Sequence, residues 1–322
     1  DDPAMQALAA ITALVIIAIA WRYQRFQRMR RDRAEDRQAM LHSPRRFHVL
    51  LLFRLHVGDK LLPTAADFMQ AVRGSSSAGL VYAGHAGFAL DSAQLGERRW
   101  NGVLLLEFPG RDEVRRFTGA LRQLAGNSFA EFHLHGMVRD RRTGLLIPLL
   151  LLGRRLLDSL RGEWRVPQLT PSAALTQSGR SHVWRNRVER LRALHKINPR
   201  ALVMFSLVRH DGRVVRRSER EYSRRMLSRM AALGHGPLHS GRAVCLGGGA
   251  RFDDIHVVHY PSAGYVADLV SSGYYQRIVA DTSFEDATAI ATVPVTVQLE
   301  AMLWPLPATG AEPQGLAHSA RA

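Results

Sequence analysis

An internal repeat constrains the fold of this chain more than any other sequence feature. HVLLLFRLH from residue 48 aligns with LVMFSLVRH from 202, YAGHAGF from 82 with HSGRAVC from 239, and WNGVLLLEFPG from 100 with FDDIHVVHYPS from 252. The three pairs occur in the same order and are all separated by about 155 residues, as expected when one structural unit is repeated. The chain is therefore interpreted as a tandem duplication.

Each copy of the repeat is predicted to contain four strands and two helices in the order βαββαβ. Strands are indicated by buried or alternating apolar runs, and helices by apolar residues spaced three and four apart. In the first copy the strands fall at 47–56, 78–90, 100–108 and 129–138, and the helices at 65–72 and 112–124. In the second copy the strands fall at 201–208, 238–246, 255–260 and 286–295, and the helices at 218–233 and 265–280.

This interpretation divides the chain into segments with different expected roles. They are a short N-terminal remnant at 1–4, a membrane helix at 5–21, a basic stalk at 22–44, the first repeat at 45–140, a connecting region at 141–198, the second repeat at 199–300 and a disordered tail at 301–322.

An uncharged apolar run at 5–21 predicts a transmembrane helix. The run, MQALAAITALVIIAIAW, is about 17 residues long, near the lower limit for crossing a bilayer, and Trp21 would lie at the interface. Positive charge directly after it places the N-terminus outside and the remainder in the cytoplasm. The sequence therefore predicts a single-pass protein of the bacterial inner membrane, with a buried core helix as the alternative. The arginines expected to bind anionic headgroups include Arg22, Arg25, Arg28, Arg30 and Arg31.

The net charge of +16 indicates an anionic neighbour. Lipid headgroups account for it, and no basic groove with interleaved aromatic residues is found, so nucleic acid is not expected as a partner. A second apolar run, LLIPLLLLGRRLLDSL at 145–160, is too short to span a bilayer. It either covers an open face of the domains or lies in the membrane interface with Arg154 and Arg155 toward the headgroups. The interfacial alternative is favoured, because the run would be a large exposed apolar patch on a soluble protein.

The segment 253–277 reads as a strand, a turn and a helix. Pro261 stops the strand, and Ser262 is suited to cap the helix that follows. The pattern YPS at 260–262, SGYYQ at 272–276 and ATVP at 291–294 resembles an uncharacterised family within the dimeric α/β-barrel superfamily. The resemblance covers residues 201–295 well, whereas the first copy keeps only FPG at 108–110 and the order of elements.

The resemblance implies two ferredoxin-like sheets packed face to face around a central barrel, here within one chain. The expected fold class is thus α+β, with two tandem ferredoxin-like βαββαβ repeats forming an intramolecular dimeric α/β-barrel, plus one N-terminal transmembrane helix. Members of the superfamily include cofactor-free monooxygenases, isomerases, cyclases, haem enzymes and plain binding modules. The fold alone therefore does not fix the function.

His259 is the candidate catalytic residue. It aligns with Glu107 across the repeat, and a free imidazole has a pKa near 7, which suits a general base. A hydrogen-bonded core or rim histidine is the alternative. Glu107, Arg242 and Tyr275 are candidate ligand-binding residues, since the arginine could meet an anion and the tyrosine hydroxyl could reach a ligand.

Other motifs exclude several chemistries. His256 and His259 are three apart on a strand and face opposite ways, while His133 and His135 share a face but have no further ligand at a helpful spacing, so no metal is predicted. The single cysteine, Cys245, is read as a packing residue. The glycines at 247–249 lack the Lys-Ser/Thr of a phosphate loop, and no hydrolase, zinc-protease or redox-thiol motif occurs. No cofactor is expected.

We expect an accessory or binding protein rather than an enzyme, with the lipid bilayer and a membrane protein or complex as partners. It would present a partner-binding or apolar-ligand-binding surface at the membrane. The alternative is a cofactor-free isomerase, cyclase or monooxygenase-like enzyme that acts on an apolar, membrane-derived molecule with His259 as the base. A haem or metal protein of the same superfamily has the least support.

Overall fold

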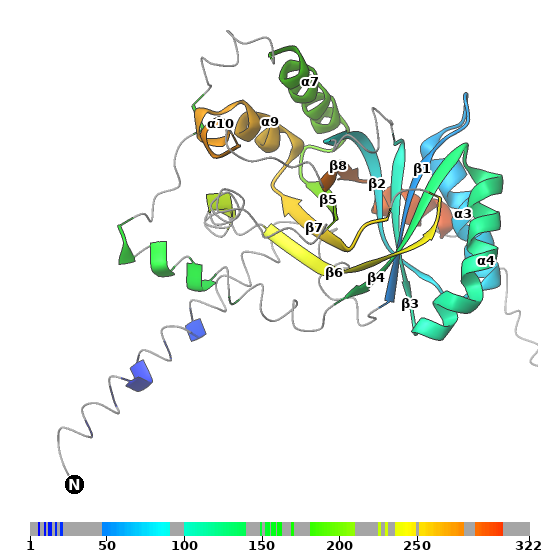
Figure 1. Cartoon of the computed structure of the whole chain (residues 1–322), viewed down its shortest axis with the longest axis horizontal. Coiled ribbons are helices and arrows are strands. Elements are labelled where there is room, and N and C mark those ends of the chain that lie inside the picture. The colour runs from blue at the N-terminus through cyan, green and yellow to red at the C-terminus, as the bar shows by residue number, and fades with distance from the viewer. Residues whose placement is uncertain are drawn as a thin grey trace, which may run out of the picture.

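The computed structural model describes the chain from Phe47 to Trp304 in six continuous stretches (Figure 1). They are residues 47–90, 100–139, 181–209, 236–248, 251–279 and 287–304, and single positions are described within 6–21, 149–162, 169–170 and 225–230.

Strands and helices are interspersed along the described part of the chain. The strands are β1 (Phe47–Arg54), β2 (Gly79–Leu90), β3 (Gly102–Phe108), β4 (Glu131–Arg139), β5 (Leu202–Val208), β6 (Gly236–Gly247), β7 (Asp254–Tyr260) and β8 (Ala287–Pro294). The helices are α3 (Leu61–Ser75), α4 (Arg111–Ser128), α7 (Ser181–Ile197), α9 (Ala263–Ser271), α10 (Gly273–Val279) and α11 (Thr296–Leu303).

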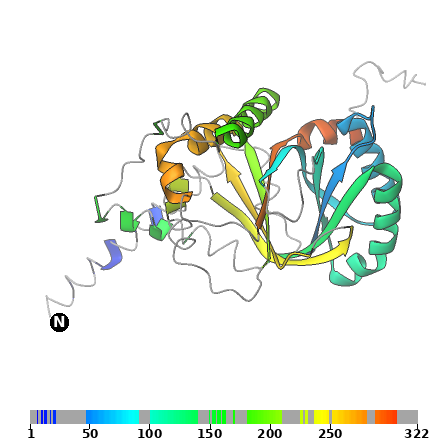
Figure 2. The same cartoon turned by 45° about the horizontal axis from the view of Figure 1, so that its top comes forward.

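The strands form one closed antiparallel barrel in the order β1-β3-β2-β8-β5-β7-β6-β4, with β4 pairing back to β1 (Figure 2). Strands from the first and second halves of the chain meet at two seams, β2 with β8 and β4 with β6. Closure gives every barrel strand a hydrogen-bonded neighbour on both sides, so no strand edge of the barrel is left unpaired.

Alternate residues of each strand point to opposite sides of the barrel wall. On β1, Leu50 and Leu52 belong to the core inside the barrel, whereas Val49, Leu51 and Phe53 pack outward against helices. The buried residues of the inner core also include Tyr82, Trp100, Val103, Leu105, Met137, Val203, Phe205, Leu207, Phe252, Ile255, Val257 and Ile290. An eight-stranded barrel is wide enough to be filled by its side chains or to hold one small ligand.

Helices cover the outside of the barrel on two sides. One outer core is shared with α3, α4 and α11 and includes Phe68, Phe117 and Leu299. The other is shared with α7 and α9 and includes Leu191, Val266 and Leu269. The two groups of helices stand apart, with α3 and α4 on one side and α7, α9 and α10 on the other (Figures 1 and 2).

Two hydroxyl groups join the β2–β8 seam inside the protein. The hydroxyls of Tyr82 and Thr292 are 2.7 Å apart, and Thr292 donates its own hydrogen to the carbonyl of Val203 at 2.8 Å. Since that hydrogen is used, Tyr82 is the donor in the first bond. Gly84 makes room for this contact, because a Cβ there would lie 2.9 Å from the Cβ of Thr292 and 2.7 Å from the Tyr82 ring.

The predicted fold class was wrong. The strands do not form two ferredoxin-like sheets that pack face to face; they form one continuous antiparallel sheet that closes on itself through the β2–β8 and β4–β6 seams. The physical reason is that alternation in sequence marks the buried faces of a strand but carries no information about which edges pair.

The membrane predictions are corrected as well. Among the residues that the structure describes, no helix is long and apolar enough to cross a bilayer. This contradicts the expected transmembrane helix and the single-pass inner-membrane location. The described positions of the 5–21 run include Trp21, which is exposed, while Arg22, Arg25, Arg28, Arg30 and Arg31 lie outside the described residues.

Candidate functional site

Histidines line the inside of the barrel. His48, His133, His135, His239 and His259 are all buried, and each occupies the inward-facing position of its strand. His259, for example, shares its face with Val257 and Ile255 of the inner core. Buried imidazoles inside an otherwise apolar core need hydrogen-bond partners, so they mark the barrel interior as the place to look for a site.

His259 and Glu107, which the repeat alignment matched, lie at the same end of the barrel but on strands at opposite sides of it, β7 and β3. Because the strands are antiparallel, the first residues of β1 and β6 and the last residues of β3 and β7 meet at this end, which we call the His259 end. His48 lies directly opposite Glu107 in the β1–β3 pairing, and the rings of His48 and His239 are 5.7 Å apart. Imidazole and carboxylate groups in such proximity can hold and transfer a proton.

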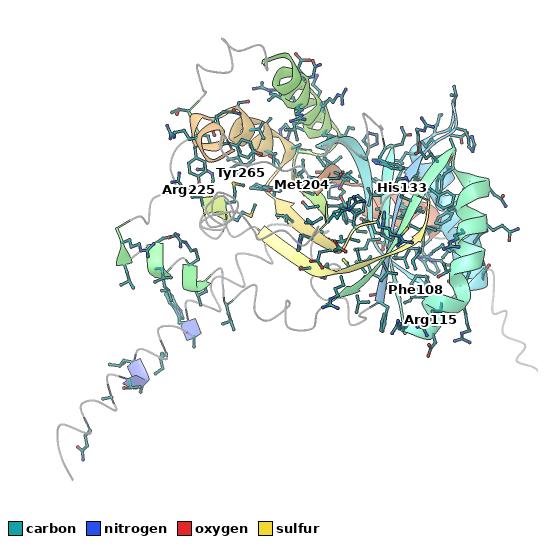
Figure 3. The ribbon with its side chains drawn as sticks, in the orientation of Figure 1. Phe108, Arg115, His133, Met204, Arg225 and Tyr265 are labelled. Atoms are coloured by element: carbon teal, nitrogen blue, oxygen red, sulfur yellow. The ribbon has the colours of Figure 1, made fainter. Side chains whose placement is uncertain are left out.

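The opposite end holds a row of four rings that we call the ring row: Trp100, His133, His135 and Phe252. The ring centroids of Trp100 and His133 are 4.7 Å apart, those of His133 and His135 are 6.2 Å apart, and those of His135 and Phe252 are 5.5 Å apart. All three contacts are edge-on, the geometry in which a ring edge meets a neighbouring face. Figure 3 shows His133 among the barrel strands.

The local sequence explains how the ring row is assembled. His133 and His135 are two apart on β4 and therefore share the inner face, opposite Leu52 and Leu50 of β1. Trp100 and Phe252 each stand just before the first residue of a strand, β3 and β7 respectively. Their side chains therefore reach the inner core from the rim of the barrel and not from an inward-facing position within a strand.

His135 is the least satisfied polar group in the ring row. It is fully buried, and neither ring nitrogen has a hydrogen-bond partner among the residues that the structure describes. Burial lowers the pKa of His135 to about 4, and the neighbouring His133 adds a smaller shift in the same direction. The ring is thus neutral at pH 7 and offers one donor and one acceptor. The buried Trp100 Nε1, a donor, likewise has no partner within the described part of the chain.

Cys245 faces the ring row from the neighbouring strand. It is the register partner of His135 in the β4–β6 seam, where the pairing is shifted by an irregularity between Leu134 and His135. Cys245 is a free cysteine and is partly buried as a residue, whereas His135 opposite it is fully buried.

Arg242 and Tyr275 lie outside the barrel interior. Arg242 is exposed on the outer face of β6, opposite Asp254 in the β6–β7 pairing. Tyr275 of α10 is buried in the outer core that also contains Tyr260. The structure therefore brings Glu107 and His259 to one end of the barrel but does not bring Arg242 or Tyr275 to them.

Arg154 forms an ion pair with an acid in its own segment. Its guanidinium is 2.8 Å from the Asp158 carboxylate, which is buried. Leu152 of the same segment is buried too, whereas Leu149, Leu157 and Leu160 are exposed. Arg155 lies outside the described residues.

A second polar cluster lies in the helical layer around Tyr265 (Figure 3). The Nε of the buried Arg229 donates to the Tyr265 hydroxyl at 2.8 Å, and the guanidinium lies 5.2 Å from the centre of the Tyr274 ring. Burial raises the pKa of both tyrosines, and the positive charge of Arg229 opposes that shift. The hydrogen bonds are made within the cluster, which fits a packing role.

Sequence reasoning missed Trp100, Phe252, His48 and His239 as interior residues. A usable signal was present for two of them, because Trp100 and Phe252 occupy equivalent positions in the aligned repeat. His48 is separated from Leu50 and Leu52 by two and four residues, so the strand pattern places all three on the same face.

Within the described ranges, no group of three or more His, Cys, Asp or Glu side chains is placed to hold a metal ion. Comparison of the chain with protein-family models, with curated proteins and with solved structures found no match.

Proposed function

We propose that this chain is a binding protein that holds a small, mostly apolar molecule inside its barrel. One observation carries the proposal: His135 is fully buried and both of its ring nitrogens lack a hydrogen-bond partner among the described residues. A buried polar group without a partner costs about 1–3 kcal/mol of stability. A bound molecule that supplies the missing hydrogen bond removes this cost, which favours its binding. An accessory protein that carries such a molecule is consistent with this arrangement.

The surroundings of His135 decide the character of the ligand. The Phe252 ring lies 5.5 Å from the His135 ring, Leu50 stands opposite His135 on β1, and the Trp100 ring packs on the neighbouring His133. Binding sites for small molecules are typically apolar with a few placed polar groups that fix orientation. The proposal therefore specifies an uncharged ligand, since an ion would lose its hydration without gaining a countercharge.

Native mass spectrometry of the full chain, purified without denaturation, tests the proposal. We expect a species heavier than the chain by the mass of one small organic molecule, and loss of that mass after unfolding and refolding. A chain of unmodified mass, together with no thermal stabilisation by any member of a library of neutral aromatic compounds, would contradict the proposal and favour a barrel that serves as a scaffold.

A cofactor-free enzyme is the second candidate, and a specific observation favours it. His259 lies on the inner face of β7, at the same end of the barrel as His48 and Glu107. A histidine near a carboxylate can act as a general base. If this candidate is correct, a compound that binds the barrel should be converted to product, and His259→Gln should abolish conversion while binding is retained. Retained conversion in that variant would exclude His259 as the base.

A further inference from the structure

The ring row carries an inference about what the barrel binds and where, which rests on the proposed binding function. The neutral imidazole of His135 presents one donor and one acceptor, and the indole of Trp100 presents one donor. A ligand that satisfies both residues must itself carry hydrogen-bonding atoms of both kinds. Hydroxyl oxygen has this property, because it donates one hydrogen and accepts through two lone pairs.

The shape of the ligand follows from the rings. Trp100 and His133 are 4.7 Å apart and meet edge to face, as do His135 and Phe252 at 5.5 Å. A planar aromatic molecule can continue this packing by presenting its edge to one ring and its face to another, and such pairs contribute beyond their buried area. An aliphatic chain would fill the volume without gaining these contacts.

Access to the ring row does not require opening of a strand pairing. Trp100 and Phe252 stand immediately outside β3 and β7, where their neighbours Asn101 and Asp253 make the backbone bonds to Phe53 and Val208. Rotation of either side chain leaves those bonds in place. The rim residues are thus able to act as a cover, and the fixed part of the site is His133 and His135 on β4.

We propose that the ring row of Trp100, His133, His135 and Phe252 is a binding site for a neutral aromatic molecule that carries a hydroxyl group. The acceptor nitrogen of the His135 ring takes the hydroxyl hydrogen, the Trp100 N–H donates to the hydroxyl oxygen, and the aromatic body of the ligand packs against the Trp100 and Phe252 rings. Charged aromatic molecules are excluded because the four residues of the ring row supply no opposite charge.

The probe for this proposal is 2-naphthol, with naphthalene as the matched compound that lacks the oxygen. Isothermal titration of the full chain at pH 7 should show saturable binding of 2-naphthol and binding of naphthalene that is at least 10-fold weaker. In ¹⁵N-labelled protein, the indole N–H resonance of Trp100, assigned by its loss in Trp100→Phe, should shift when 2-naphthol is added. Equal affinity for the two compounds, or an unmoved Trp100 resonance at saturation, would overturn the proposal.

Variants test whether 2-naphthol binds at the ring row or elsewhere in the barrel. His135→Phe keeps an aromatic ring and removes both nitrogens, and we expect it to weaken 2-naphthol binding at least 10-fold without affecting naphthalene. His256→Phe is the control, since His256 lies on the outer face of β7 and bonds to Ser240 at 2.8 Å. It should bind 2-naphthol as the unmodified chain does. Trp100→Phe provides a second test if His135→Phe does not fold, with an expected loss of about 3-fold to 10-fold from one hydrogen bond.

The binding function of the barrel and the assignment of the binding site to the ring row can be disproved separately. If a molecule co-purifies or 2-naphthol binds, but folded His135→Phe and Trp100→Phe bind as the unmodified chain does, the assignment to the ring row is wrong and the binding function stands. If nothing co-purifies and neither compound binds, both are wrong.

Discussion

The hydroxyl of Tyr82 donates to the hydroxyl of Thr292 across the seam that joins the two halves of the chain. Tyr82→Phe removes only the donor, so we expect the free energy of unfolding to fall by about 1 kcal/mol. Thr292→Val removes the acceptor and also leaves the Tyr82 hydroxyl and the Val203 carbonyl buried without this partner. We expect it to cost more, about 1–3 kcal/mol. Urea denaturation of both variants and of the double variant measures the coupling, and a strictly additive result would show that the bond contributes nothing.

The glycines of the barrel wall and of the helices should respond oppositely to alanine. A methyl group at Gly84 would meet the Thr292 side chain and the Tyr82 ring, so Gly84→Ala should destabilise by about 1–3 kcal/mol through overpacking. Gly119 lies inside α4, and no neighbouring atom comes within 4 Å of the place that an alanine methyl group would take. Gly119→Ala should therefore stabilise by about 0.5–1 kcal/mol. Thermal denaturation of the two variants checks the signs, and a neutral or stabilised Gly84→Ala would show that the seam has spare volume.

Burial of His135 makes stability depend on pH. An unfolded histidine has a pKa near 6.5 and the folded His135 a pKa of about 4, so between these values the unfolded state holds a proton that the folded state lacks. The free energy of unfolding should therefore fall as the pH is lowered from 6.5 toward 4, by up to about 3 kcal/mol from this residue. Above pH 7 the contribution of His135 should not change with pH.

Denaturation curves at several pH values isolate this contribution. The slope of stability against pH should be smaller in His135→Phe than in the unmodified chain, while His56→Phe, which changes an exposed histidine, should keep the original slope. An unchanged slope in His135→Phe would mean that other buried histidines account for the acid sensitivity.

Ser262 caps α9, and its removal should have a measurable cost. Its side chain accepts a hydrogen bond from the backbone N–H of Tyr265 at 3.0 Å. Ser262→Ala should lower the free energy of unfolding by about 1 kcal/mol. Ser271→Ala is the control, because the Ser271 hydroxyl only returns a bond to the carbonyl of Ala267 within the helix, an interaction of little net value. Equal losses in the two variants would argue against a specific effect of the cap.

The sequence predicted most strands, the helix cap at Ser262 and the face of β7 on which His259 lies. The apolar run that begins at Phe47 was placed on a strand, and β1 is buried on both faces, inside the barrel and against the helices. The cap at Ser262 is confirmed. The inward position of His259 follows from its alternation with Val257, although only the structure shows that this face lines the barrel. These features depend on neighbours close in sequence, which is why they were predictable.

Features that depend on distant contacts were not predictable in this way. The seams of the barrel join residues such as Tyr82 and Thr292, which are far apart in the chain. Arg242 was a candidate ligand-binding residue, but it lies on the outer face of β6, opposite Asp254. The helix α11 was also missed; it is held by Leu299 and Leu303, which pack into the outer core.

The closed order of strands has a consequence for the independence of the two halves. If the chain were cut between β4 and α7, the first fragment would expose the edges of β2 and β4, and the second would expose those of β6 and β8. Each fragment would have two strand edges with unpaired backbone N–H and C=O groups, and the strands that pair with these edges are on the other fragment. The halves are therefore expected to behave as complementing fragments, poorly soluble when produced alone and reconstituting one folded species when produced together.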